Sequence, residues 1–182
     1  MTVPLVIVVV VLLGTFVGSG SGGHGNGPLR PLKVSAPPHA EAEAKPCTAL
    51  LEALPLKLKA LDPRTVDPTP PTPFVVAWGD PAIVVRCGVD KPSALKPGSD
   101  AELIAGGELS GAYYYVGEQG GANIYTAVDR QAFVSFTIPA KYQGADYLPI
   151  LNAAVLKAMP KAVCSTSSTE LDVSKLCSRR TG

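Results

Sequence analysis

Charged residues are scarce in this sequence of 182 residues, and neither sign of charge dominates. Charged side chains make up 17% of the chain, against about 25% in an average protein. Lysine and arginine number 16 and aspartate and glutamate 15, a formal net charge of +1. The chain therefore lacks the basic surplus by which proteins bind nucleic acids or anionic membrane surfaces, and we expect no nucleic-acid partner.

Histidine is scarcer still. The two histidines, His24 and His39, lie in a stretch rich in glycine and proline, so we expect none in the folded part. This expectation excludes Ser-His-Asp and Cys-His catalysis and histidine-ligated metal sites there. The four cysteines form no CxxC pair, and a zinc site would have to collect them from scattered positions. We expect no metal and no other cofactor.

The first 29 residues carry no charged side chain, and Arg30 is the first charged residue. Within this stretch, Val3 to Val17 is apolar apart from Gly14 and Thr15. A helix of this length rises about 22 Å, less than the ~30 Å hydrocarbon core, although flanking residues bring it near the lower limit for a span. The run also fits the apolar region of a secretory signal peptide. We predict that residues 1–19 form a membrane anchor or a signal segment, and we disfavour a buried core helix.

No lysine or arginine precedes the apolar run, whereas signal peptides and many anchors carry one there. We therefore expect the natural start to lie upstream of Met1. Residues 20–46, rich in glycine, serine and proline, are predicted to be a flexible linker. Gly18, Gly20 and Gly23 match a dinucleotide-binding spacing, but no strand and helix flank them, so they indicate no cofactor.

An even number of cysteines behind an export segment indicates two disulfides formed in an oxidising compartment. Cys47 falls on the apolar stripe of a predicted helix. Cys87 alternates with Ile83 and Val85 on one face of a predicted strand. Three pairings are open, and we favour Cys47–Cys87 together with Cys164–Cys177.

The remaining chain, residues 47–182, is predicted to be one extracytoplasmic domain. Helices are expected at 48–61, interrupted by Pro55, and at 146–159, with a loop over 62–73. Strands are expected at 74–78, 82–89, 102–105, 112–116, 122–128 and 131–138. Hairpins in place of crossovers predict an α+β fold, with an antiparallel sheet of four to five strands and two flanking helices.

The sheet register is less determined by the sequence. We expect a five-residue loop over 117–121 and a two-residue turn at Asp129 and Arg130. One face would then carry Tyr113, Tyr115, Tyr125, Val134 and Phe136, and the other Tyr114, Val116, Ile124, Val128 and Phe133. Both sets are apolar, so which face is covered stays open, and a partner or the anchor region would cover the second.

Three residues near the first hairpin are candidates for a ligand site or a structural motif: Trp78, Asp80 and Arg86. Asp80 suits a turn, where aspartate bonds to nearby backbone, with ligand binding as the alternative. Arg86 lies on an apolar strand and needs a partner, either Asp80, Asp90 or a bound anion. The six tyrosines from Tyr113 to Tyr147 suit either core packing or a glycan-stacking surface.

The segment from Ala77 to Val89, with its sequence AWGDPAIVVRCGV, is distinctive. Together with the helix that begins at Cys47 and the later run FVSFTIP, it resembles the actinobacterial family called domain of unknown function 3515. The resemblance covers roughly residues 47 to 160. It implies an exported or single-pass envelope protein, and it implies no known activity.

We expect a cell-envelope protein, either single-pass with its C-terminal domain outside the membrane or secreted. Its predicted role is non-catalytic binding or assembly with an envelope protein partner. The alternative is a hydrolase that acts on envelope glycan or peptidoglycan through two carboxylates about 5–10 Å apart. Its candidate carboxylates are Asp80, Asp90, Glu102, Glu108 and Asp129. Ser93 and Lys96 match the SxxK spacing of acyltransferases, with a faint echo of KTG at Arg180-Thr181-Gly182, but prolines flank the first motif.

Overall fold

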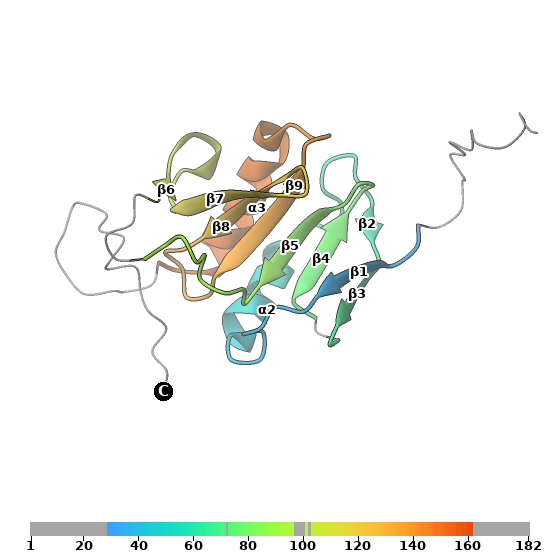
Figure 1. Cartoon of the computed structure of the whole chain (residues 1–182), viewed down its shortest axis with the longest axis horizontal. Coiled ribbons are helices and arrows are strands. Elements are labelled where there is room, and N and C mark those ends of the chain that lie inside the picture. Colours follow the sequence, from blue (N-terminus) through green and yellow to red (C-terminus); the bar gives the residue numbers. More distant parts are fainter. Residues whose placement is uncertain (1–28, 72, 97–100, 102, 162–182) are drawn as a thin grey trace, which may run out of the picture.

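A seven-stranded antiparallel sheet organises the molecule (Figure 1). The computed structural model describes residues 29–71, 73–96, 101 and 103–161. The strand order is β2 (Pro63–Arg64), β4 (Val75–Trp78), β5 (Ile83–Cys87), β9 (Val134–Pro139), β8 (Ala122–Ala127), β7 (Tyr114–Gln119) and β6 (Leu103–Ile104). The predicted α+β class is confirmed, and the sheet has more strands than the expected four to five.

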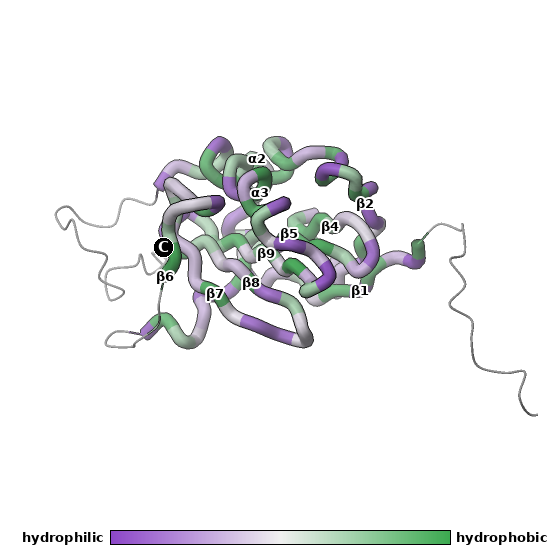
Figure 2. The backbone as a smooth tube through the Cα atoms, turned by 90° about the horizontal axis from the view of Figure 1, so that it is seen from above, coloured by the Kyte–Doolittle hydropathy of each residue, from purple (hydrophilic) through white to green (hydrophobic). Residues whose placement is uncertain are grey.

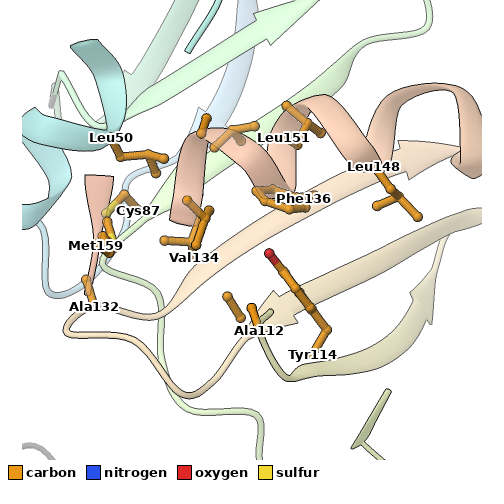
Figure 3. Packing of buried hydrophobic residues seen from close by; sticks show 14 of the residues in the cluster. Leu50, Cys87, Ala112, Tyr114, Ala132, Val134, Phe136, Leu148, Leu151 and Met159 are labelled. Atoms are coloured by element: carbon orange, nitrogen blue, oxygen red, sulfur yellow. The ribbon is translucent and has the colours of Figure 1, made fainter. Parts of the chain in front are cut away.

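Two α-helices of the described chain, α2 (Ala44–Ala53) and α3 (Gly144–Ala158), cover one face of the sheet, as predicted. Figure 3 shows Phe136 of β9 lying beneath α3, with Leu148 and Leu151 above the sheet. The largest fully buried side chains of this core include Leu50, Ile83, Tyr114, Phe136, Leu151 and Met159. A side chain of this size stabilises the fold by about 1.5–3 kcal/mol when fully buried. The apolar stripes of the two helices therefore pack on the sheet and form the main core with it.

The first helix is shorter than predicted. α2 ends at Ala53, and Leu54 has extended backbone (φ −72°, ψ 144°). A proline disfavours helical backbone in the residue before it, so Pro55 stops the helix instead of kinking it. The predicted loop over 62–73 contains β2 and also β3 (Val66–Thr69).

Part of the second sheet face is covered by the chain itself. β1 (Leu32–Ser35) pairs in parallel with β3, and Figure 2 shows β1 on the side of the sheet opposite to α2 and α3. Leu32 and Val34 of β1 pack with Val66 against the small cluster Val75, Ala77 and Val84. The sequence predicts a flexible linker over this stretch, because two apolar residues among prolines give little signal.

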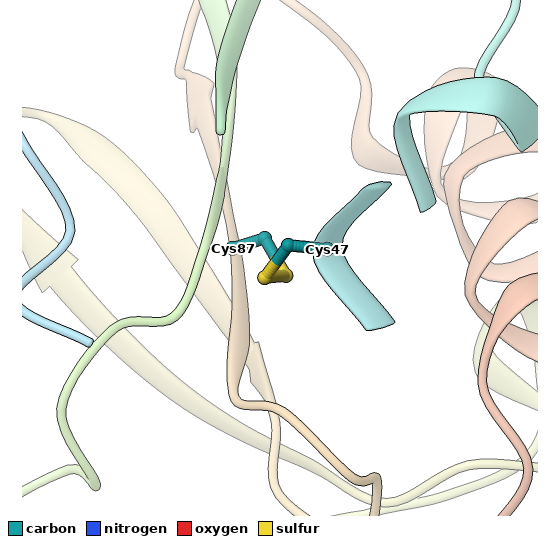
Figure 4. The surroundings of a disulfide bond; sticks show 2 residues. All are labelled: Cys47 and Cys87. Carbon is teal, nitrogen blue, oxygen red and sulfur yellow. A yellow bond between two sulfur atoms is a disulfide. The ribbon is translucent and has the colours of Figure 1, made fainter. Parts of the chain in front are cut away.

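The predicted Cys47–Cys87 disulfide is present and joins α2 to β5 (Figure 4). The two Cα atoms lie 5.6 Å apart, and both side chains are fully buried. The helical stripe and the strand alternation placed both cysteines toward the same core, which is why their pairing could be predicted.

The hairpin between β7 and β8 corrects the predicted register. Gln119 pairs with Ala122, so the connection is the two residues Gly120 and Gly121, both with positive φ (59° and 73°). Such a turn matches the twist of the strands, and glycine adopts it without strain. A five-residue loop would shift the pairing of β7 with β8 by an odd number of residues. Such a shift puts Tyr115 on the helix-covered face, which is wrong. Tyr115 faces away from the helices, and Tyr114 packs on Phe136, with 5.7 Å between ring centroids.

The connection between β8 and β9 is six residues long, not a two-residue turn, because Ala127 pairs with Val134. The difference is an even number of residues, so Tyr125, Val134 and Phe136 do share a face as predicted. Asp129 and Arg130 are buried here, 6% and 7% exposed.

The predicted anchor or signal segment, residues 1–19, lies outside the described residues, as do Glu102, Cys164, Cys177 and the segment Arg180-Thr181-Gly182. Within the described ranges, none of the helices has the length and apolar character needed to cross a bilayer.

Candidate functional site

A row of polar side chains crosses the sheet face that the helices leave open. Arg86 of β5 pairs with Ser135 of β9, Ser135 with Thr126 of β8, and Thr126 with Tyr115 of β7. Directly opposite residues on neighbouring strands have Cβ atoms about 4.5–5.5 Å apart, so the four side chains are continuous neighbours. Ser135 and Thr126 are each only 5% exposed. Buried hydroxyls in a sheet otherwise rich in apolar residues need an explanation.

This row forms the floor of a groove of about 640 Å³, which we call the sheet groove. Its volume is within the range of small-molecule sites. One wall comes from the segment before α2 and the other from the loop after β5. The lining residues are Pro38, Arg86, Val89, Asp90, Lys91, Pro92, Ser93, Ala94, Tyr115, Gly117, Glu118, Gln119, Ile124, Thr126 and Ser135.

Arg86 supplies the charge at the floor of the sheet groove. Burial lowers the pKa of its guanidinium, and the nearby negative charge of Asp90 acts in the opposite direction. An arginine stays charged even so. Its Nη2 donates to Ser35 Oγ and to the Ala36 carbonyl, both at 3.4 Å, and its buried Nε has no partner among the described residues. The guanidinium therefore has unused donor capacity.

The carboxylates predicted to pair with Arg86 have other partners. Asp80 accepts a hydrogen bond from Nη1 of Arg64 at 2.8 Å. Asp90 Oδ1 lies 2.7 Å from His39 Nε2. Asp90 lines the sheet groove and influences Arg86 through its charge, whereas Asp80 precedes β5 at the opposite end of that strand.

The sequence predicts His39 in a linker, and this prediction is wrong, because His39 lies against the folded sheet. Its backbone N–H donates to the Gly88 carbonyl at 2.9 Å, besides the side-chain contact with Asp90. The approach is close, because a Cβ on Gly88 would lie 2.9 Å from the backbone nitrogen of Ala40. These contacts fix the wall of the groove that contains Pro38.

Trp78 and Asp80 belong to the fold. Trp78 is 3% exposed, and its indole N–H donates to the Leu56 carbonyl at 3.2 Å. The turn after it is held by Lys141, whose Nζ donates to the Asp80 carbonyl at 2.7 Å, and by Tyr142, whose hydroxyl donates to the Pro81 carbonyl at 2.8 Å. These contacts account for the distinctive WGDP segment as a structural turn.

The candidate carboxylates do not gather in one cleft among the described residues. Asp90 lines the sheet groove, Asp80 lies beyond the other end of β5, and Glu108 is in the 3₁₀ helix η1 (Gly107–Leu109). Asp129 is buried beside Arg130, with 3.3 Å between Oδ1 and Nε, and accepts a hydrogen bond from the Tyr113 N–H. The described residues also contain no group of three or more His, Cys, Asp or Glu placed to hold a metal ion.

The SxxK motif lies in a turn, not at the start of a helix. Leu95 N–H donates to the Pro92 carbonyl at 2.9 Å, Leu95 is buried, and Ser93 is exposed at the rim of the sheet groove. The helical context that a Ser/Lys acyltransferase requires is not met.

The tyrosines divide between core and surface. Tyr114 is fully buried, and its hydroxyl donates to Asn152 Oδ1 at 2.9 Å; burial raises the pKa of this phenol. Tyr142 and Tyr147 meet edge to face, with 5.5 Å between ring centroids. Tyr115 lines the sheet groove. The register expected from the sequence puts Tyr115 on the other face, and the sequence pattern marks neither Ser135 nor Thr126. The Gly120-Gly121 dipeptide is the signal that corrects the register.

The fold and the sheet groove together define the class of the protein. It is a disulfide-linked α+β protein in which part of one sheet face stays open as a polar groove. A family model described as protein of unknown function (DUF3515) matches residues 1–164, and the chain belongs to that family. The match confirms the family resemblance of the WGDP segment and the flanking elements. No curated protein and no solved structure matches the chain.

Proposed function

We propose that this protein is a component of an actinobacterial cell envelope, anchored through its N-terminal segment or secreted. Its α+β domain acts there as a non-catalytic binding or assembly module. The uncharged apolar run over residues 3–17 supports export. The buried Cys47–Cys87 bond supports it as well, because such bonds persist in oxidising compartments.

The observation that carries the binding role is the sheet groove. A face with no role in binding would be expected to carry apolar residues under cover or charged residues in water. The sheet groove instead combines a half-buried arginine that has unused donors with two hydroxyl side chains that are 5% exposed. A few polar groups converging in a partly apolar concavity are typical of ligand sites.

The hydrolase alternative receives less support from the same geometry. It needs two carboxylates that face one cleft. Asp90 and Glu118 both line the sheet groove, but the side chain of Glu118 alternates toward the helix-covered face, because Glu118 pairs with Asn123 and Asn123 with Ile138. Asp90 is hydrogen-bonded to His39.

Cross-linking in intact cells tests the proposal. A photoreactive amino acid is placed at Gln119, an exposed residue that lines the sheet groove, and in a matched control at Glu52, an exposed residue of α2 on the other face. Cells are irradiated and fractionated, and the products are identified by mass spectrometry. We expect the protein in the envelope fraction, with one dominant product that forms from Gln119 and not from Glu52. Recovery in the cytosol, or identical products from both positions, would contradict the proposal.

A further inference from the structure

The charged residues that line the sheet groove indicate the chemistry of its ligand. Its charged lining residues are Arg86 at the floor, Lys91 and Asp90 on one wall, and Glu118, whose side chain alternates away from the floor. Asp90 keeps its negative charge, although its Oδ1 is already in contact with His39 Nε2. The charged groups of the floor and this wall that can donate hydrogen bonds to a ligand are Arg86 and Lys91, and both favour an anionic group on the ligand.

The coordination of Arg86 specifies the anion further. A guanidinium has five N–H donors, and the bonds to Ser35 and Ala36 are long at 3.4 Å. A carboxylate is matched in shape to this planar group and would accept from its Nη atoms, of which Nη2 makes only the two long bonds, whereas the buried Nε is out of a ligand's reach. The charge of Asp90, close enough to act on Arg86, disfavours a doubly charged phosphate more than a singly charged carboxylate.

The rest of the floor suits a peptide. Next to Arg86, the hydroxyls of Ser135 and Thr126 can both donate to and accept from amide groups. Ile124 and Tyr115 offer apolar contact further along the groove, and Val89 does so on the wall. Capture of a terminal carboxylate is an established mode of peptide recognition, and amide-bonding hydroxyls beside the cation suit the adjoining peptide bond.

We infer that the sheet groove binds the free carboxyl terminus of a short peptide, with the terminal carboxylate on Arg86 and the adjoining amides over Ser135 and Thr126. The inference rests on the proposed function, because it names the ligand class of the same groove. Two sources share this chemistry, the C-terminus of an envelope protein and the stem peptide of the cell wall. They differ in the configuration of the last residue, which is L in proteins and commonly D in cell-wall peptides.

Affinity selection with the full-length protein in detergent micelles tests the inference. The probes are three pools of N-acetylated tripeptides with apolar side chains: one with a free carboxylate on an L residue, one with a free carboxylate on a D residue, and one with a C-terminal amide. Retained peptides are quantified by mass spectrometry. We expect at least one carboxylate pool to be retained about ten- to a hundredfold more than the amide pool, the range for a charge-assisted hydrogen bond. The preferred configuration identifies the source.

Variants separate Arg86 from general effects of charge. Arg86→Gln should abolish the preference for carboxylate over amide, and Arg86→Lys should retain only part of it, because lysine lacks the planar fork. Arg30→Gln, the same change at an exposed arginine outside the groove, should retain it within twofold. If Arg86→Gln fails to fold by circular dichroism, Thr126→Val removes one hydroxyl of the floor at nearly constant shape and should weaken retention several-fold.

Equal retention of carboxylate and amide pools, retention of none of the pools, or an unchanged preference in folded Arg86→Gln would overturn the inference. These outcomes are distinguishable from failure of the proposed function. A groove-specific cross-link from Gln119 without carboxylate preference in the peptide selection leaves the binding role standing and removes the peptide-terminus ligand. Selective peptide retention without any groove-specific cross-link in cells removes the envelope partner instead.

Discussion

Removal of the Cys47–Cys87 bond should lower the free energy of unfolding by about 4 kcal/mol. The two residues are 40 apart in the sequence. In the chain-entropy model, cross-linking a loop of this length removes about 13 cal/mol/K from the unfolded state, which is about 4 kcal/mol at 25 °C. Native stabilities are typically about 5–15 kcal/mol, so the bond is a large fraction of the total.

The double variant Cys47→Ala/Cys87→Ala removes this bond and leaves the other cysteines unchanged. Urea unfolding followed by circular dichroism gives both the free energy of unfolding and its dependence on urea, the m-value. The matched control is Leu50→Ala, a fully buried position on the same helix, which should cost about 2–5 kcal/mol through a cavity. Because the bond restrains the unfolded chain, its loss should raise the m-value, whereas Leu50→Ala should leave the m-value unchanged.

A loss below about 1 kcal/mol together with an unchanged m-value would refute this reasoning, since the bond would then not constrain the unfolded chain. A large loss with an unchanged m-value would show that the cysteines act through core packing, as Leu50 does.

Three further changes test the packing. Gly79→Ala should destabilise more than Gly120→Ala; both residues have positive φ, but a Cβ at 79 would lie 2.8 Å from Tyr142 Oη, whereas nothing lies within 4 Å at 120. The free energy of unfolding should fall as the pH rises above about 10. Burial raises the pKa of Tyr114, so the folded state keeps a proton that the unfolded state has lost. Tyr114→Phe should reduce this pH dependence in urea melts. Arg130→Met should cost roughly 3–5 kcal/mol by leaving Asp129 buried without its cation, with partial recovery in Asp129→Asn/Arg130→Met.

Each of these three predictions has an outcome that would contradict it. Equal costs for both glycine variants would show that the turn relaxes away from Tyr142. If the free energy of unfolding falls equally steeply above pH 10 in Tyr114→Phe, the pH dependence belongs to other groups. Tyr142, whose pKa burial also raises, is the first of these. Additive losses in the Asp129 and Arg130 variants would show that the two side chains act independently.

The elements that the sequence predicts well are those whose periodicity agrees with their environment. The Cys47–Cys87 bond could be predicted because a helical stripe and a strand alternation each identify one buried face. The antiparallel hairpins and both helices follow from the same kind of signal. Their ends are less certain, as α2 shows: the predicted helix ran through Pro55, and the structure ends it two residues before that proline.

The candidate site could be predicted only in part, because it depends on register and on segments with weak patterns. Arg86 was singled out, since a charge on an apolar strand needs a partner. Tyr115 is assigned to the wrong face by the sequence, because a loop length wrong by an odd number of residues exchanges the faces of β7. Ser135 and Thr126 are missed for another reason, since one hydroxyl in an apolar strand gives little sequence signal. The wall near Pro38 was missed because β1 is four residues long and packs through only Leu32 and Val34.

The position of the disulfide also decides how the molecule would respond to mechanical load. A pull on the chain upstream of Leu32 would act first on the pairing of β1 with β3, and then on the contacts of His39 with Gly88 and Asp90. Unravelling would stop at Cys47, which is covalently fixed to the sheet. Fully extended, the chain between Leu32 and Cys47 spans about 50 Å. Tension would therefore remove one wall of the sheet groove while the rest of the core stays intact.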